Sequence, residues 1–253
     1  MNMMMMRMMN NLVAPNKPSK QMAMDIAKII TDAGTWTPRS KQVSIGPSEI
    51  GHECLRRLAY KLIDIPKVNE GSNGNWAAQV GTAIHAHLAE IFEKIEGFKT
   101  EQKVTIRGGL SGTVDLYDEI RGIVMDWKTT GASGLKERRS SGATTQQQIQ
   151  VQLYGYGLAQ QGLLVNQVAL IYLPTSGGID DMHIELYDYD EQIALAALAR
   201  LDNLYALLTS IDVEQFPSMW AVIPKVSSRL CNYCPYFQPF SKDESVACAG
   251  DTI

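Results

Sequence analysis

The chain has 253 residues, of which 45% are hydrophobic and 20% charged, as in an ordinary globular protein. Its net charge of −4 excludes an overall positive field, so any contact with nucleic acid must come from local basic patches. No apolar run reaches the ~18 residues of a membrane-spanning helix, and the Met-rich start lacks the features of a signal peptide. We therefore expect a cytoplasmic protein with no membrane partner. Residues 1–17 are expected to form a disordered leader and 18–253 a single domain.

The first hundred residues contain mainly helical patterns. Apolar residues at helical spacing predict a first helix over 19–34, with Gly34 at its end. A second helix is expected over 48–65 and carries Cys54. A third helix is expected over 80–97, where apolar residues form a continuous stripe.

The rest of the chain alternates strands and helices. Strands are expected over 103–108, 109–119, 122–130, 167–174 and 181–189, a polar loop over 131–145, and helices over 146–162 and 190–210. The order predicts an α/β fold in which a mixed central β-sheet is flanked by helices.

Three charged residues lie in an otherwise apolar hairpin, at Asp115, Asp126 and Lys128. Asp126 and Lys128 share one strand face, and pairing about the turn places Asp115 opposite Asp126, ~5 Å away. Two carboxylates this close repel unless a cation lies between them or one is protonated. A divalent ion such as Mg²⁺ suits this site, and Lys128 would stabilise developing negative charge beside it. Taken alone, the same charges also fit a solvent-facing hairpin.

Two further features are compatible with a site. His85 flanks the apolar stripe of its helix, although a half-buried structural histidine shows the same pattern. Gln152 and Tyr156 are four residues apart and so share a helix face. The nearby Gly155 and Gly157 disfavour a helix, which suggests that a ligand or another segment approaches closely there.

Four cysteines occur, and two of them form the chelating pair Cys231-x2-Cys234. Cys248 follows, and Cys54 lies far upstream, so a site using all four would bring distant segments together. Structural zinc sites usually use two close pairs, whereas a cubane iron–sulfur cluster tolerates scattered ligands. The residues alone leave zinc and iron–sulfur equally open.

The order of these motifs resembles the RecB-like branch of the PD-(D/E)XK nucleases. The motifs are G-T-x-x-H, G-x-V-D, D-x-K and Q-x-x-x-Y, within a frame of four cysteines. That frame is similar to the iron–sulfur members: the CRISPR-associated iron–sulfur exonucleases, the AddB nuclease domain and phage-encoded relatives. The resemblance runs from about residue 48 to 248.

The resemblance implies a restriction-endonuclease-like core and a role for each motif. His85, Asp115, Asp126 and the Trp127 carbonyl would bind Mg²⁺ or Mn²⁺. Lys128 would be the catalytic lysine, and Gln152 and Tyr156 would shape the site near DNA. The cysteines would hold a 4Fe–4S cluster that joins the N- and C-terminal segments; these ligands are Cys54, Cys231, Cys234 and Cys248.

The implied function is a metal-dependent DNA exonuclease that acts on single strands or DNA ends in recombination, repair or phage DNA processing. If the protein is phage-encoded, it would act in the host cytoplasm. Five basic residues are candidates for phosphate contacts, although a solvated loop would explain the last three equally well: Arg56, Arg57, Lys136, Arg138 and Arg139. The alternative is a catalytically silent DNA-binding or adaptor module with a structural zinc or iron–sulfur site.

Overall fold

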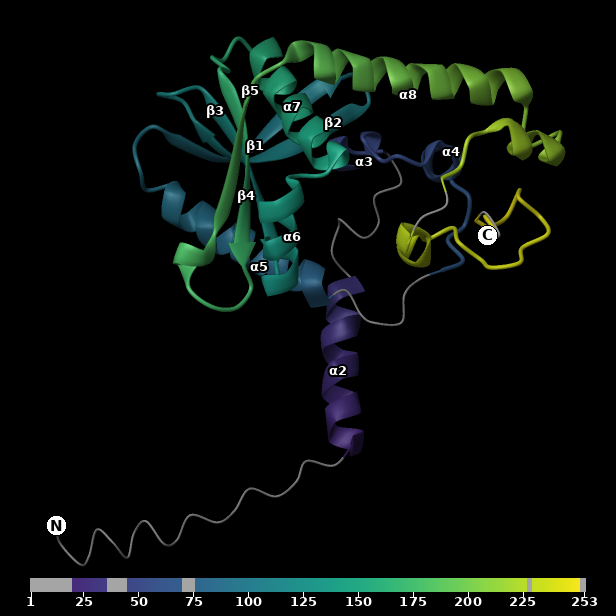
Figure 1. The fold of residues 1–253 in the computed structure, drawn as a ribbon, viewed down its shortest axis with the longest axis horizontal. Coiled ribbons are helices and arrows are strands. Elements are labelled where there is room, and N and C mark those ends of the chain that lie inside the picture. Colours follow the sequence, from purple (N-terminus) through teal and green to yellow (C-terminus); the bar gives the residue numbers. More distant parts are fainter. Residues whose placement is uncertain (1–19, 36–44, 70–75, 227–228, 251–253) are drawn as a thin grey trace, which may run out of the picture.

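A computed structural model describes residues 20–35, 45–69, 76–226 and 229–250, so the expected leader lies outside the described residues. Its centre is one five-stranded sheet in the order β1-β2-β3-β4-β5 (Figure 1). The strands are β1 (Phe98–Arg107), β2 (Leu110–Asp118), β3 (Ile123–Thr130), β4 (Gln167–Pro174) and β5 (His183–Asp188). β3 and β4 run parallel, and the other neighbouring pairs are antiparallel. The expected α/β fold with a mixed sheet is confirmed.

The helices are α2 (Lys20–Thr35), α3 (Pro47–Ile50), α4 (Leu55–Leu62), α5 (Trp76–Phe92), α6 (Ala132–Ser141), α7 (Thr145–Gln160) and α8 (Glu191–Ile211). Short 3₁₀ helices occur at Ile179–Asp181, Pro217–Val222 and Arg229–Tyr233. Two expectations differ from this structure. The helix expected over 48–65 is interrupted between α3 and α4, and the loop expected over 131–145 contains α6, which buries Leu135.

The interruption between α3 and α4 has a packing cause. At Gly51 the chain lies so close to α7 that a Cβ atom there would stand 2.7 Å from Cα of Gln146. The Gln146 side chain also donates a hydrogen bond to the Ser48 carbonyl, at 2.6 Å. The segment that precedes Cys54 is therefore fastened directly to the first turn of α7.

The tight turn between β2 and β3 makes their hairpin. Asp118 accepts hydrogen bonds from the backbone N–H groups of Ile120 and Arg121, at 3.1 and 2.9 Å. Gly122 closes the turn with φ of 69°, a conformation that glycine adopts without steric cost. The turn fixes the register of both strands and, with it, the positions of the carboxylates further along them.

Helices cover both faces of the sheet (Figure 1). Ile84 and Leu88 of α5 pack with Leu116 and Trp127 on one face. Val151 and Leu158 of α7 pack on the other, in a cluster that includes residues of β1 to β4. Burial of these apolar side chains stabilises the layers by roughly 1.5–3 kcal/mol for each large residue.

The two glycines in α7 allow close packing. A Cβ atom at Gly155 would lie 2.9 Å from the ring of Tyr189, and one at Gly157 would lie 2.9 Å from Val104 on β1. The close approach suggested by the sequence is therefore made by neighbouring side chains of the fold.

Asp190 caps the N-terminus of α8, because its side chain accepts a hydrogen bond from the Gln192 N–H at 2.9 Å. By length and composition it is the one described helix that could cross a membrane. Core helices of soluble proteins pass the same test, and α8 buries one face, including Leu198, Leu201 and Leu204, against α4 and the C-terminal segment.

The C-terminal segment folds back over α4, and Arg56 holds it there. This side chain is 2% exposed and donates to the carbonyls of Trp220 and Ile223, at 2.6 and 2.7 Å. It also forms an ion pair with Glu244, at 2.6 Å. The expectation that Arg56 contacts DNA phosphate is corrected, because the guanidinium is enclosed by the protein's own segments.

Candidate active site

The site lies where β2 and β3 separate. Their backbone pairing runs from Asp118 opposite Ile123 to Leu116 opposite Met125. The next step of this register brings Asp115 towards Asp126, and both carboxylates are buried, with 6% and 3% exposure. The backbone pairing of the two strands ends at this step, and side chains from α5 and α7 contact the carboxylates there.

His85 reaches the site from α5. Its Nδ1 atom lies 3.3 Å from Oδ1 of Asp115. The helix approaches β3 closely because residue 81 is a glycine, at which a Cβ atom would lie 3.1 Å from the Thr129 hydroxyl. Burial lowers the pKa of His85, but the hydrogen bond to Asp115 and its negative charge outweigh this effect. The pKa of His85 is therefore raised above its ordinary value.

Asp126 is bound on both of its oxygens by neighbouring side chains. Lys128 Nζ lies 2.5 Å from Oδ2, and Gln150 Nε2 donates to Oδ1 at 3.0 Å. The amide oxygen of Gln150 accepts from Lys128 at 2.9 Å, so one glutamine orients both charged groups. Burial raises the pKa of Asp126, against the opposing effect of the Lys128 charge.

The structure brings Gln150 and Tyr154 to this site in place of Gln152 and Tyr156. Gln150 also donates to the Tyr154 hydroxyl at 3.1 Å, and the Tyr154 ring packs against Gly112 of the G-x-V-D motif. Gln152 is buried away from the carboxylates, where it accepts from the Asp190 N–H and donates to the Asp188 carbonyl. Tyr156 packs at the edge of the apolar cluster of α8.

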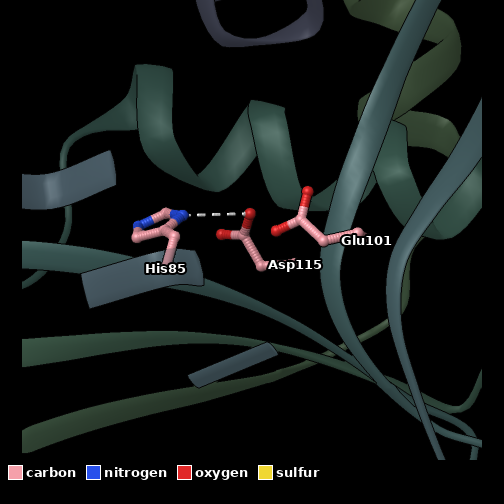
Figure 2. A group of neighbouring side chains, drawn as sticks. All are labelled: His85, Glu101 and Asp115. Carbon is pink, nitrogen blue, oxygen red and sulfur yellow. Dashed lines mark ion pairs between the residues drawn. The ribbon is translucent and has the colours of Figure 1, made fainter. Parts of the chain in front are cut away.

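One residue of the site was absent from the sequence expectations. Glu101 lies on β1, across from Asp115, and its carboxylate points towards Asp115 and His85 (Figure 2). The ligand atoms of these three residues all lie within 4.8 Å of one another, and no other three potential ligands do so in the described parts of the chain. An exposed glutamate in an alternating strand gives no sequence signal of such a role.

The donors at this site fit a divalent cation. One imidazole and two carboxylates converge, and a third carboxylate, Asp126, is buried behind them with no hydrogen bond to its Oδ2 atom besides the ion pair with Lys128. Buried carboxylates need a compensating charge, and Mg²⁺ and Mn²⁺ prefer such ligands. The backbone of Trp127 is also part of the site, because its N–H donates to Asp115 Oδ2 at 2.9 Å.

All four cysteines line one pocket, between the start of α4 and the C-terminal segment. The residues are Cys54, Cys231, Cys234 and Cys248, and all are free thiols. Burial raises the pKa of Cys234 and Cys248, so both thiols are protonated at neutral pH when no metal is bound. Arg57 also lines this pocket and lies within hydrogen-bond distance of His52.

Helix α6 carries the remaining basic candidates. Lys136 and Arg139 are exposed, whereas Arg138 is half-buried and donates to the Gly142 carbonyl at 2.8 Å. Arg139 donates to the Asp181 carbonyl. Of these three, Lys136 is the one that forms no hydrogen bond or ion pair with another described residue, and its side chain is exposed on α6.

Comparison with known proteins gives a family match and distant structural neighbours. The family model of the PD-(D/E)XK nuclease superfamily matches residues 73–238. No curated protein sequence matches the chain. Solved structures that are similar to the chain include two exonucleases. An alkaline exonuclease from Laribacter hongkongensis has 13% identity and a TM-score of 0.48, with 70% of this chain and 95% of that chain covered. A phage-related exonuclease from Haemophilus somnus 129PT has 16% identity and a TM-score of 0.46, with coverages of 78% and 90%.

Proposed function

The chain belongs to the PD-(D/E)XK nuclease superfamily, and we propose that it is a Mg²⁺- or Mn²⁺-dependent DNA exonuclease. The observation that carries this proposal is the convergence of Asp115, Asp126 and Lys128 with His85 at the separation of β2 and β3. These are the four residues whose motifs resemble the nuclease signature. The proposed substrate is single-stranded DNA or DNA ends, in recombination, repair or phage DNA processing in the cytoplasm.

The side chains divide the chemistry of phosphodiester hydrolysis among them. His85, Asp115, Asp126 and the Trp127 carbonyl would hold the ion, which supplies a Lewis acid and lowers the pKa of a water molecule when bound. Lys128 would stabilise the negative charge that develops on the phosphate in the transition state. Gln150 would orient Lys128 and Asp126 relative to each other, since its amide group forms a hydrogen bond with each.

The basic surface of α6 would bind the DNA backbone. Lys136 is exposed on the helix that directly follows the catalytic strand β3. A positive side chain so placed attracts phosphate without reading sequence, which suits an enzyme that degrades DNA from an end. Arg57 is a weaker candidate because it lies beside the thiols of the cysteine pocket.

We further propose that the cysteine pocket holds a 4Fe–4S cluster, as in the iron–sulfur exonucleases that the chain resembles. The support is that all four cysteines line one pocket, so that four thiolates could ligate one metal centre. A cubane cluster held by four thiolates accepts ligands that are scattered along the chain, as Cys54 and Cys248 are.

A catalytically silent DNA-binding module on the same fold is the competing function. The site opposes it, because a silent module does not require two buried carboxylates, one of which, Asp126, has its pKa raised by burial. A buried charge cluster of this kind costs stability, and such clusters occur most often at functional sites.

The deciding experiment is a digestion time course on DNA strands labelled at the 5′ or the 3′ end, with Mg²⁺, with Mn²⁺ and with chelator. The expected result is metal-dependent release of short products from one end. DNA binding without cleavage under every metal condition would establish the silent module instead. Products from internal positions would show an endonuclease.

A further inference from the structure

Glu101 lies at an irregular position in β1. Thr100 pairs with Leu116 and Gln102 pairs with Val114, so Glu101 stands across from Asp115 between two regular pairs. Its own backbone leaves the strand conformation, with φ of 49°. This left-handed conformation is uncommon for any residue other than glycine, and it is found here beside the two carboxylates.

Three potential metal ligands lie closest together in the described structure, and Asp126 lies outside this group because it is paired with Lys128. The ligand atoms of His85, Glu101 and Asp115 lie within 4.8 Å of one another (Figure 2). Asp126 is turned towards Lys128 and Gln150, which occupy its two oxygens. Asp115 keeps Oδ1 towards His85 because its Oδ2 is held by the Trp127 N–H.

We propose that Glu101 is a direct ligand of the divalent ion, with His85 and Asp115. This proposal rests on the proposed metal-dependent nuclease function and adds a carboxylate from β1 to its ion site. Glu101 would be a ligand in addition to Asp126, which is paired with Lys128 in this structure. Because imidazole suits Mn²⁺ better than Mg²⁺, this set of ligands favours Mn²⁺ when no DNA is bound.

Two substitutions separate a ligand role from a structural one. Glu101→Gln keeps the size of the side chain and removes its charge. Glu101→Gly removes the ligand while accommodating the left-handed backbone, so the melting temperature of the metal-free protein should be unchanged or higher. If Glu101 only supported the fold, its substitution would lower the melting temperature. Loss of Mn²⁺ affinity with an unchanged or higher melting temperature therefore indicates a metal ligand. Glu119→Gln, a matched control, removes the same charge from an exposed position at the far end of β2.

The test is calorimetric titration of the full-length, DNA-free protein with Mn²⁺, together with thermal melting. Both Glu101 variants should weaken Mn²⁺ binding by at least about tenfold, since even groups that only support a metal ligand contribute that much. Glu119→Gln should bind as the unaltered protein does. Unchanged Mn²⁺ affinity in Glu101→Gln, with binding lost in Asp115→Asn, would overturn the role of Glu101 and leave the nuclease proposal standing. An unaltered protein that neither binds Mn²⁺ nor cleaves DNA would overturn the nuclease proposal itself.

Discussion

The backbone N–H of Trp127 donates to Oδ2 of Asp115 at 2.9 Å, so a side chain of β2 accepts this bond from β3. The contact fixes the rotation of the Asp115 carboxylate and directs Oδ1 towards His85. A ligand that is oriented by a second hydrogen bond binds metal with less loss of side-chain freedom. The separation of the two strands is therefore part of how the site is built.

Asp126→Asn should abolish metal-dependent cleavage, with a rate loss of more than about a hundredfold, because it removes a buried charge from the site. The fold should persist, since the amide has the same shape as the carboxylate and its burial costs less. Cleavage assays and circular dichroism check both parts. Asp118→Asn is the matched control: it weakens the β2–β3 turn and should lower stability while leaving cleavage intact. Near-normal cleavage by Asp126→Asn would disprove the assignment.

Lys128→Ala should reduce turnover far more than DNA affinity, because its charge acts mainly in the transition state. Lys136→Ala should show the opposite pattern, with weaker DNA binding and turnover at saturation unchanged. Single-turnover kinetics with varied DNA concentration separate the two effects. Collapse of binding with normal turnover in Lys128→Ala would make this residue a phosphate anchor.

Gln150→Ala should lower turnover, on the order of tenfold to a hundredfold, since Lys128 and Asp126 lose the amide that orients them. Gln152→Ala should lower the melting temperature without reducing turnover per folded molecule, because its bonds hold the start of α8. Measuring kcat and Tm for both variants tests which of the two Q-x-x-x-Y spacings serves catalysis. If Gln152→Ala lowers turnover and Gln150→Ala lowers only the melting temperature, the proposed role of Gln150 in the site is wrong.

The pH dependence of Mn²⁺ binding should follow the raised pKa of His85. The imidazole must be neutral to bind metal, so affinity should fall by about tenfold per pH unit below this pKa, which lies above 6.5. The stability of the metal-free protein should change with pH in the opposite direction. The ion pair between protonated His85 and Asp115 stabilises the fold fully below pH 6.5. That stability is lost as pH rises through the raised pKa. His85→Gln should flatten both profiles, as titration and melting across pH 5 to 8 (about the range where histidine titrates) would show.

With the proposed cluster, the unaltered protein should be brown when it is purified without oxygen. Cys234→Ala should remove this colour and lower the melting temperature by roughly 5 °C or more. Nuclease activity should fall only as the fold is lost, because the thiols lie apart from the carboxylates. Asn232→Ala, an exposed position between the paired cysteines, should stay brown. Iron, sulfide and zinc analysis checks the metal, and colourless protein with stoichiometric zinc would overturn the cluster.

Local patterns predicted the sheet and the placement of the paired carboxylates. The turn at Gly122 fixes the hairpin register, and that register alone brings Asp115 towards Asp126. The cysteines were also expected in one place, and the structure lines one pocket with them. In both cases the spacing of residues along the sequence was enough to predict which side chains lie near one another.

The choice between Gln150 and Gln152 could not be made from sequence. Both begin a Q-x-x-x-Y spacing, and α7 is buried all round between Gln150 and Gly155, so amphipathicity does not show which face meets the carboxylates. The burial of Arg56, which was expected to contact DNA phosphate, could not be predicted for a related reason. Its environment is created by the C-terminal segment, which returns over α4 from far along the chain.

The distance along the chain between Cys54 and the other three thiols sets an order of assembly. His85 to Tyr154 supply the whole nuclease centre, whereas the cysteine pocket cannot close until residue 248 has left the ribosome. Contacts that are near in sequence form first, and those that join distant segments form last. Loading of the proposed cluster would then follow the formation of the nuclease centre. A cell short of the metal of that cluster would accumulate chains whose nuclease centre is complete and whose terminal segments are not joined at the cysteine pocket.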